Sequence, residues 1–178
     1  MEALVTGGKC SVKNEERFYM SVTRVFIHGL ESSSQGTKGV YFREKYPDMM
    51  IEDFFGPFDQ RMKKLNMLLL EKTDLVLVGS SYGGLMAAIY TLKNEKKVKK
   101  LILLAPALNL AEFKPYLNRK LSVPVMLYHG RNDDVVPPYS VHDAARMVFA
   151  DLHHHLVDDD HSLHDTFKNM NWDGLFKD

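Results

Sequence analysis

The sequence predicts a single α/β domain: a mostly parallel sheet of about six strands with helices on both faces. Short, nearly continuous apolar runs alternate with longer amphipathic segments along the chain. Runs of this kind are typical of strands that are buried on both faces of a parallel sheet. The length of 178 residues suits one domain. The composition, 45% hydrophobic and 26% charged, is that of a globular protein.

Six apolar runs are the strand candidates. They are Val25–Ile27, Met50–Ile51, Leu75–Val78, Leu101–Leu104, Val125–Leu127 and Leu156–Val157. The segments around them supply five helix candidates. These are Gly36–Lys45, Gln60–Lys72, Tyr82–Lys93, Tyr139–Phe149 and Ser162–Phe176. Because strands and helices alternate, a doubly wound sheet is expected, in which functional groups collect at the carboxyl ends of the strands.

Residues 1–20 are a polar leader, and residues 21–178 form the predicted domain. The leader has no apolar stretch like that of a secretory signal, and the run Leu101–Leu108 is far short of the ~20 residues that a bilayer span needs. With a single cysteine, Cys10, this favours a cytoplasmic protein. Basic and acidic residues balance at 23 each, so neither nucleic acid nor a membrane surface is an expected partner. We expect a monomer or a homodimer.

A Gly-x-Ser-x-Gly motif, Gly79 to Gly83, joins the third apolar run to a helix candidate. A sharp strand-to-helix turn that exposes a serine hydroxyl needs small residues two positions away on each side, and both glycines meet that need. The turn places Ser81 at a helix N-terminus, which favours developing negative charge, and makes the backbone N–H of Tyr82 a candidate oxyanion donor. The alternative is an ordinary turn in which Ser80 or Ser81 caps the helix.

Polar loops follow the fifth and sixth apolar runs and carry a candidate acid and a candidate base. A nucleophilic serine needs an imidazole base and a carboxylate that holds the imidazole in the right tautomer. Asp133 and its rival Asp134 lie in the first loop. His161 lies in the second loop, whereas its rival His164 lies one turn into a helix candidate. Three aspartates precede His161, and some of them must point away if its pKa is to suit a base.

These features together resemble the α/β-hydrolase superfamily. The resemblance rests on the strand that runs into His28-Gly29, on the serine motif, and on the loop Gly-x-x-Asp-x-Val-Val-Pro that contains Asp133, and it extends from about Arg24 to Trp172. The chain is similar in particular to small single-domain serine esterases without a large lid. The resemblance implies a three-layer α/β-hydrolase fold with a trimmed sheet and no cofactor. It also implies a catalytic triad of Ser81, Asp133 and His161, and a second oxyanion donor at the backbone N–H of Leu30.

Other residues have less certain roles at this stage. Gly29 and Glu31 are candidate substrate contacts, and so is His28, although we expect His28 mainly to fix its loop because a base candidate lies elsewhere. Five aromatic residues are candidates for an acyl pocket or for core packing: Phe54, Phe55, Phe58, Phe113 and Tyr116. No metal site is expected, because three successive strand histidines, residues 153–155, cannot converge on one ion.

The activity that the resemblance implies is acyl transfer from a small soluble carboxylic ester through an acyl-enzyme. The short span between Ala105 and Pro124 leaves no room for a cap domain, so the site should be open. A thioesterase or peptidase of the same fold, and a binding module without catalysis, are the alternatives. Nucleotide binding is disfavoured, because no Gly-rich phosphate loop follows the first apolar run.

Overall fold

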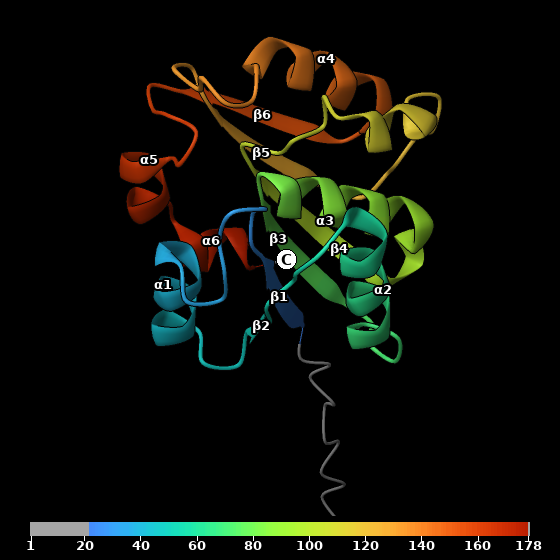
Figure 1. Ribbon diagram of the computed structural model, residues 1–178, viewed down its shortest axis with the longest axis vertical. Helices are drawn as coiled ribbons and strands as arrows, with labels where there is room; N and C mark the ends of the chain where they lie inside the picture. The colour runs from blue at the N-terminus through green and yellow to red at the C-terminus, as the bar shows by residue number, and fades with distance from the viewer. Residues whose placement is uncertain (1–21, 178) are drawn as a thin grey trace, which may run out of the picture.

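The computed structural model describes residues 22–177, so the predicted leader and Cys10 lie outside the described residues. Its centre is a six-stranded, all-parallel sheet with the strand order β2-β1-β3-β4-β5-β6 (Figure 1). The predicted sheet of about six mostly parallel strands is therefore confirmed. The strands are β1 (Thr23–Ile27), β2 (Met50–Ile51), β3 (Leu75–Ser80), β4 (Val98–Leu104), β5 (Val125–Gly130) and β6 (Leu152–Val157).

Helices cover both faces of this sheet. They are α1 (Thr37–Lys45), α2 (Phe58–Leu68), α3 (Tyr82–Lys93), α4 (Pro138–Val148), α5 (His164–Asn169), α6 (Trp172–Leu175), and the 3₁₀ helices η1 (Glu95–Lys97) and η2 (Ala111–Tyr116). Alternate strand residues point to opposite faces. Leu75 and Leu77 of β3 pack in the cluster that contains residues of α2, α3 and α4, whereas Val76 and Val78 pack in the cluster that contains residues of α1, α5 and α6. The three-layer prediction is confirmed.

The predicted C-terminal helix, Ser162–Phe176, is wrong as one element, because the chain forms α5 and α6 instead. Met170 between them is extended, with ψ 139°, and the Asn171 side chain caps α6 by accepting from the N–H of Gly174 at 3.0 Å. Phe167 and Trp172 explain the break. Both are buried, yet residues five apart on one helix point about 140° apart. The turn lets both rings reach the same cluster.

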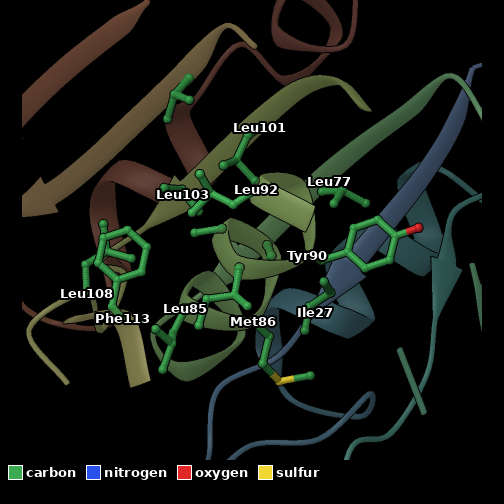
Figure 2. Packing of buried hydrophobic residues seen from close by; sticks show 14 of the residues in the cluster. Ile27, Leu77, Leu85, Met86, Tyr90, Leu92, Leu101, Leu103, Leu108 and Phe113 are labelled. Atoms are coloured by element: carbon green, nitrogen blue, oxygen red, sulfur yellow. The ribbon is translucent and has the colours of Figure 1, made fainter. Parts of the chain in front are cut away.

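Helix α3 lies at the centre of the larger core. Residues 83–92 of this helix are all buried, so it is covered on every side. Figure 2 shows its residues Leu85, Met86 and Tyr90 among side chains of the strands and of η2. A helix that is apolar all round is stable only when it is enclosed. The start of α3, at Tyr82, is therefore held in place by the core that surrounds the helix.

The parallel strands bring the candidate residues to one edge of the sheet. In register, the end of β1 lies beside the end of β3, with Ile27 opposite Gly79, and the end of β5 lies beside the end of β6, with Gly130 opposite Val157. The polar loops that follow these four strands therefore meet at the carboxyl edge. Within residues 22–177, no helix has the length and apolar character that crossing a bilayer requires.

Candidate active site

Ser81 occupies a strained turn between β3 and α3. Its φ of 54° and ψ of −117° are rare for a residue with a side chain. Both motif glycines are required here, because a side chain at either position would clash with the backbone. A Cβ atom on Gly83 would lie 2.1 Å from the carbonyl oxygen of Ile27, and one on Gly79 would lie 2.5 Å from the carbonyl oxygen of Gly83. The backbone N–H of Ser81 donates to the carbonyl of Leu104 at 2.9 Å and fixes the turn to β4.

The structure brings Ser81, His161 and Asp133 together in a hydrogen-bonded line. The hydroxyl oxygen of Ser81 lies 3.0 Å from Nε2 of His161, and Nδ1 of His161 lies 2.7 Å from Oδ2 of Asp133. A carboxylate only accepts, so Nδ1 carries a proton and donates it. In a neutral imidazole Nε2 is then free to accept the proton of the serine hydroxyl. This is the arrangement that activates a serine as a nucleophile.

Asp133, rather than Asp134, completes this line. The Asp133 side chain is fully buried, whereas Asp134 is exposed. Besides His161, the Asp133 carboxylate accepts from the backbone N–H groups of Val135 and Val136 at 2.9 and 2.8 Å. Nε2 of His129 lies 2.9 Å from Oδ2. Three N–H donors, with the His129 ring beside them, thus offset the cost of burying the carboxylate and fix its orientation.

His129 lies against the Asp133 carboxylate, a contact that the sequence did not predict. Its Nε2 lies 2.9 Å from Oδ2 of Asp133 and 3.0 Å from the carbonyl oxygen of Val136, and since both oxygens accept, Nε2 carries the proton. Burial lowers the pKa of His129, so the ring is neutral. A signal was available in the sequence. A His-Gly pair directly follows β1 and another ends β5, and only the first of these pairs was singled out.

The three aspartates before His161 each have another partner. Asp158 accepts from the side chain of Asn132 at 3.0 Å, and Asp160 lies 2.8 Å from Nδ1 of His164. Burial opposes ionisation of Asp159, but backbone N–H donors, that of Thr166 foremost, outweigh it and lower the pKa of its carboxyl. Within the described residues, none of these three carboxylates is bonded to the His161 ring. His164 is likewise paired with Asp160 and not with Ser81.

The two candidate oxyanion donors lie beside Ser81. Leu30, Tyr82 and Ser81 line the same cleft. Gly29 brings the first loop close, because a Cβ atom on it would lie 3.4 Å from Cβ of Ser81. Among the backbone bonds made outside helices and strands by residues 22–177, none uses the N–H of Leu30 or Tyr82 as donor. Both N–H groups therefore remain available near the serine hydroxyl.

His28 was one of the candidate substrate contacts, but it does not line the cleft. It is 1% exposed; Nδ1 lies 2.7 Å from the carbonyl oxygen of Gly29, and Nε2 lies 2.9 Å from the backbone nitrogen of Phe54, from which it accepts. Burial lowers its pKa, so the ring is neutral and both nitrogens are used within the protein. His28 fixes its loop. Gly29 and Glu31 do line the cleft, and Glu31 is exposed.

The cleft has a volume of about 530 Å³, and its walls differ from the acyl pocket that the aromatic residues suggested. Phe54 and Phe113 are fully buried in the core, and Phe55 is 63% exposed. None of the five aromatic candidates lines the cleft among the described residues. Two other phenylalanines do line it. The apolar residues of its walls are Phe26, Leu30, Tyr82, Ala107, Leu110, Val135, Val136, Leu163 and Phe167.

Lys38 is a further polar residue of the cleft that the sequence reasoning missed. Its ammonium group, from α1, donates to the carbonyl oxygen of Ser162, the residue after His161. Burial lowers the pKa of Lys38, although the charges of Asp160 and Asp159 oppose this effect. The bond ties the backbone beside His161 to α1. Nothing in the local sequence around Lys38 indicates this contact, which spans 124 positions.

Comparisons with known proteins agree with this architecture. A family model described as alpha/beta hydrolase fold matches residues 31–118. The comparison with curated proteins found no match. Alpha/beta hydrolase domain-containing protein 10 from mouse is 21% identical, with a TM-score of 0.68, over 81% of this chain and 83% of the mouse chain. An esterase from Pyrococcus furiosus is 18% identical, with a TM-score of 0.66, over 86% of this chain and 79% of its own.

Est1E from Butyrivibrio proteoclasticus, solved with ferulic acid bound, is 15% identical, with a TM-score of 0.67, over 83% of this chain and 84% of its own. At such identities the likeness establishes the fold. The chain therefore has the α/β-hydrolase fold, as the sequence resemblance implied. Within that fold its described part has a trimmed, six-stranded sheet, and its structural neighbours include proteins named as esterases.

Proposed function

We propose that this chain is a serine hydrolase that cleaves small carboxylic esters through an acyl-enzyme. The observation that carries the proposal is the line from the Ser81 hydroxyl through His161 to the buried carboxylate of Asp133, with distances of 3.0 and 2.7 Å. The line opens into a cleft and begins at a helix N-terminus. Nucleophile, base and orienting acid are thus within hydrogen-bond reach of one another, as acyl transfer needs.

Acylation follows from this geometry. Oγ of Ser81 attacks the ester carbonyl carbon while its proton passes to Nε2 of His161, and the carbonyl oxygen becomes an oxyanion. The bond to the leaving alcohol then breaks, and His161 returns the proton to that alcohol. Asp133 stays ionised throughout and stabilises the imidazolium. Deacylation repeats the sequence with water as the nucleophile and releases the acid, so the chemistry needs no cofactor.

The oxyanion is stabilised by the backbone N–H groups of Leu30 and Tyr82. Each lies at the start of a segment fixed by its neighbours: Leu30 follows the Gly29 that closely approaches Ser81, and Tyr82 is the first residue of the enclosed helix α3. Loss of one such donor typically lowers turnover by ~10² to 10³. The apolar walls and the volume of about 530 Å³ suit a small acyl group.

The first test is covalent labelling with a fluorophosphonate probe, alongside turnover of p-nitrophenyl acetate and butyrate. Ser81→Ala should abolish labelling and turnover, and His161→Ala should reduce both severely. Ser122→Ala is the matched control, because Ser122 is exposed just before β5, at the opposite edge of the sheet. A natural chain that is neither labelled nor active would refute the proposal. Matched thioester and anilide substrates then rank the three acyl-transfer activities.

The identity of the acid is tested by a second matched pair. Asp133→Asn should lower kcat by up to ~10⁴, since an amide no longer holds the imidazole in the tautomer that accepts the serine proton. Asp134→Asn, one residue along the same loop, should leave kcat within about twofold because Asp134 is exposed. Equal losses in the two variants would remove Asp133 from the proposed triad.

A further inference from the structure

Arg61 is a buried cation in the first turn of α2. It is 4% exposed, and it is the one arginine or lysine among the buried residues of the described chain. Among the ion pairs found in residues 22–177, none includes its guanidinium. Burying a cation without a carboxylate partner is costly in free energy. The groups that it contacts therefore indicate what the burial achieves.

The guanidinium of Arg61 contacts both residues of the proposed oxyanion hole. Its Nη2 donates to the carbonyl oxygen of Leu30 at 3.2 Å, and its carbon Cζ lies 5.5 Å from the centre of the Tyr82 ring. A third contact, from Nε to the carbonyl oxygen of Gly56 at 2.8 Å, anchors the group on the far side. Nη1 is buried without a partner. One side chain thus connects the loop of Leu30, the loop of Gly56 and the start of α3 at Tyr82.

Two contacts hold the backbone around Leu30: Nδ1 of His28 lies 2.7 Å from the carbonyl oxygen of Gly29, in the peptide that carries the Leu30 N–H, and Arg61 holds the carbonyl of Leu30 itself. The Leu30 side chain does not add such support. That side chain is 52% exposed, so apolar packing holds it weakly. The carbonyl and the N–H of Leu30 flank the same Cα atom, so a bond that holds the carbonyl also restricts the direction of the N–H. Oxyanion donors are effective only when they are oriented before the charge develops. A rotation of Leu30 would therefore weaken the hole without disturbing Ser81 or His161.

We propose that Arg61 is a positioning residue for the oxyanion hole, which it orients through the Leu30 carbonyl and the Tyr82 ring. This inference rests on the proposed function. Arg61 does not touch the reacting atoms; it acts through the two backbone donors. Its loss should therefore impair stabilisation of the transition state and leave ground-state binding and the Ser81–His161–Asp133 line unchanged.

The test compares Arg61→Met with Lys63→Met, which removes a cation from the same helix at an exposed position. With p-nitrophenyl butyrate, Arg61→Met should lower kcat about 10- to 100-fold, less than the ~10² to 10³ for complete loss of a donor. KM should stay within about twofold. Lys63→Met should match the natural chain. Arg61→Lys keeps the charge and one donor group, so it should recover part of the lost kcat.

Two further readouts separate positioning from general damage. A trifluoromethyl ketone forms a tetrahedral oxyanion adduct with a reactive serine, so its affinity for Arg61→Met should fall by about the same factor as kcat/KM. The acid limb of the pH profile of kcat/KM should not move, because Arg61 makes no contact with His161 or Asp133. Burst titration measures the concentration of active sites, so that every kcat is calculated per folded enzyme molecule.

Unchanged kcat per titrated site in Arg61→Met and Arg61→Lys would overturn the inference, and so would a loss that appears only in KM. If Arg61→Met does not fold, the test uses Arg61→Lys alone. A kcat and a ketone affinity equal to those of the natural chain would then overturn the inference. Failure of the proposed function has another signature, because the natural chain itself would then show neither labelling nor turnover.

Discussion

At the scale of single residues, the site is organised around one carboxylate. Asp133 accepts from three donors, among them the imidazole of His161 on the side of the cleft, and a second imidazole, that of His129, lies 2.9 Å from it on the buried side. The groups that face His129 are Asp133, His161 and His154. Since its Nε2 carries a proton, His129 stabilises the negative charge of Asp133. It should therefore influence how firmly Asp133 holds the imidazole of His161.

His129→Phe should lower kcat. Without the polar N–H beside it, the Asp133 carboxylate is less firmly oriented and holds the imidazole of His161 less well in place. A polar contact to a charged group contributes about 1.5 kcal/mol, which corresponds to about tenfold in kcat. His129→Gln keeps a donor and should lower kcat less. Equal losses in both variants, or none, would contradict this role.

The sequence alone was sufficient to place the candidate residues whose positions depend on local chain geometry. Ser81 could be placed because the turn it occupies requires glycines two residues away, and His161 because it follows a strand. Arg61 and His129 could not, because their partners Leu30 and Asp133 are set by how loops meet at the sheet edge. A lone arginine on a helix gives no sign that it is buried until the helix is docked.

At the scale of elements, one aromatic cluster joins both ends of the described chain. Phe42 of α1 is fully buried, and its ring lies 5.1 Å from that of Phe26, 5.3 Å from that of Phe167 and 4.7 Å from that of Trp172. Because α5 starts three residues after His161, this cluster also supports the loop that holds His161. Its packing thus links the stability of the fold to the geometry of the site.

Phe42→Ala should lower the free energy of unfolding by about 3 to 5 kcal/mol, the usual cost of removing a fully buried phenylalanine. Phe55→Ala is the matched control, because Phe55 is 63% exposed, and its effect should stay within about 0.5 kcal/mol. Urea unfolding followed by circular dichroism measures both. Comparable losses in the two variants would show that this cluster is not a main source of stability.

Strand β6 should make the protein sensitive to acid through His154. Burial lowers the pKa of His154 to about 4, with smaller contributions from the nearby His142, His129 and His155. The unfolded chain takes up this proton near the ordinary value of 6.5, and the folded chain only near 4. The contribution of His154 to stability is therefore fully present above pH 6.5 and is lost as the pH falls toward 4.

The measurement is the difference in Tm between pH 7.5 and pH 5. His154→Gln should reduce this difference, because the variant has no group at this position that takes up a proton on unfolding. His153→Gln is the control, since His153 is an exposed neighbour on the same strand whose ring pairs with Asp151 at 3.1 Å. An unchanged difference in His154→Gln would mean that other groups dominate the acid response.

At the scale of the whole molecule, the class of fold followed from the alternation of apolar runs and helices, but the details did not. Strand β6 was predicted only at Leu156–Val157, although it begins at Leu152. As an edge strand it alternates between exposed and half-buried residues, and its three histidines interrupt the apolar run. The break between α5 and α6 was missed for a similar reason, because it depends on where Phe167 and Trp172 must pack.

The connection from β4 to β5 determines how substrate reaches the cleft. Residues 105–124 contain only the six-residue helix η2, so this connection has no room for a cap domain. At the rim of the cleft, Leu30 and Val135 are 52% and 64% exposed. Within residues 22–177 no cap covers Ser81, so under the proposed function turnover of a soluble ester should not depend on an oil–water interface.

The rate of tributyrin hydrolysis should accordingly rise smoothly with concentration and level off, with no jump where the ester exceeds its solubility and forms an emulsion. A lipase with a mobile lid, assayed in parallel, should show that jump. p-Nitrophenyl butyrate, measured below its solubility limit, gives the kcat of the monomeric ester for comparison. A several-fold rise of the tributyrin rate at saturation would mean that a segment covers Ser81 in solution and must move before substrate binds.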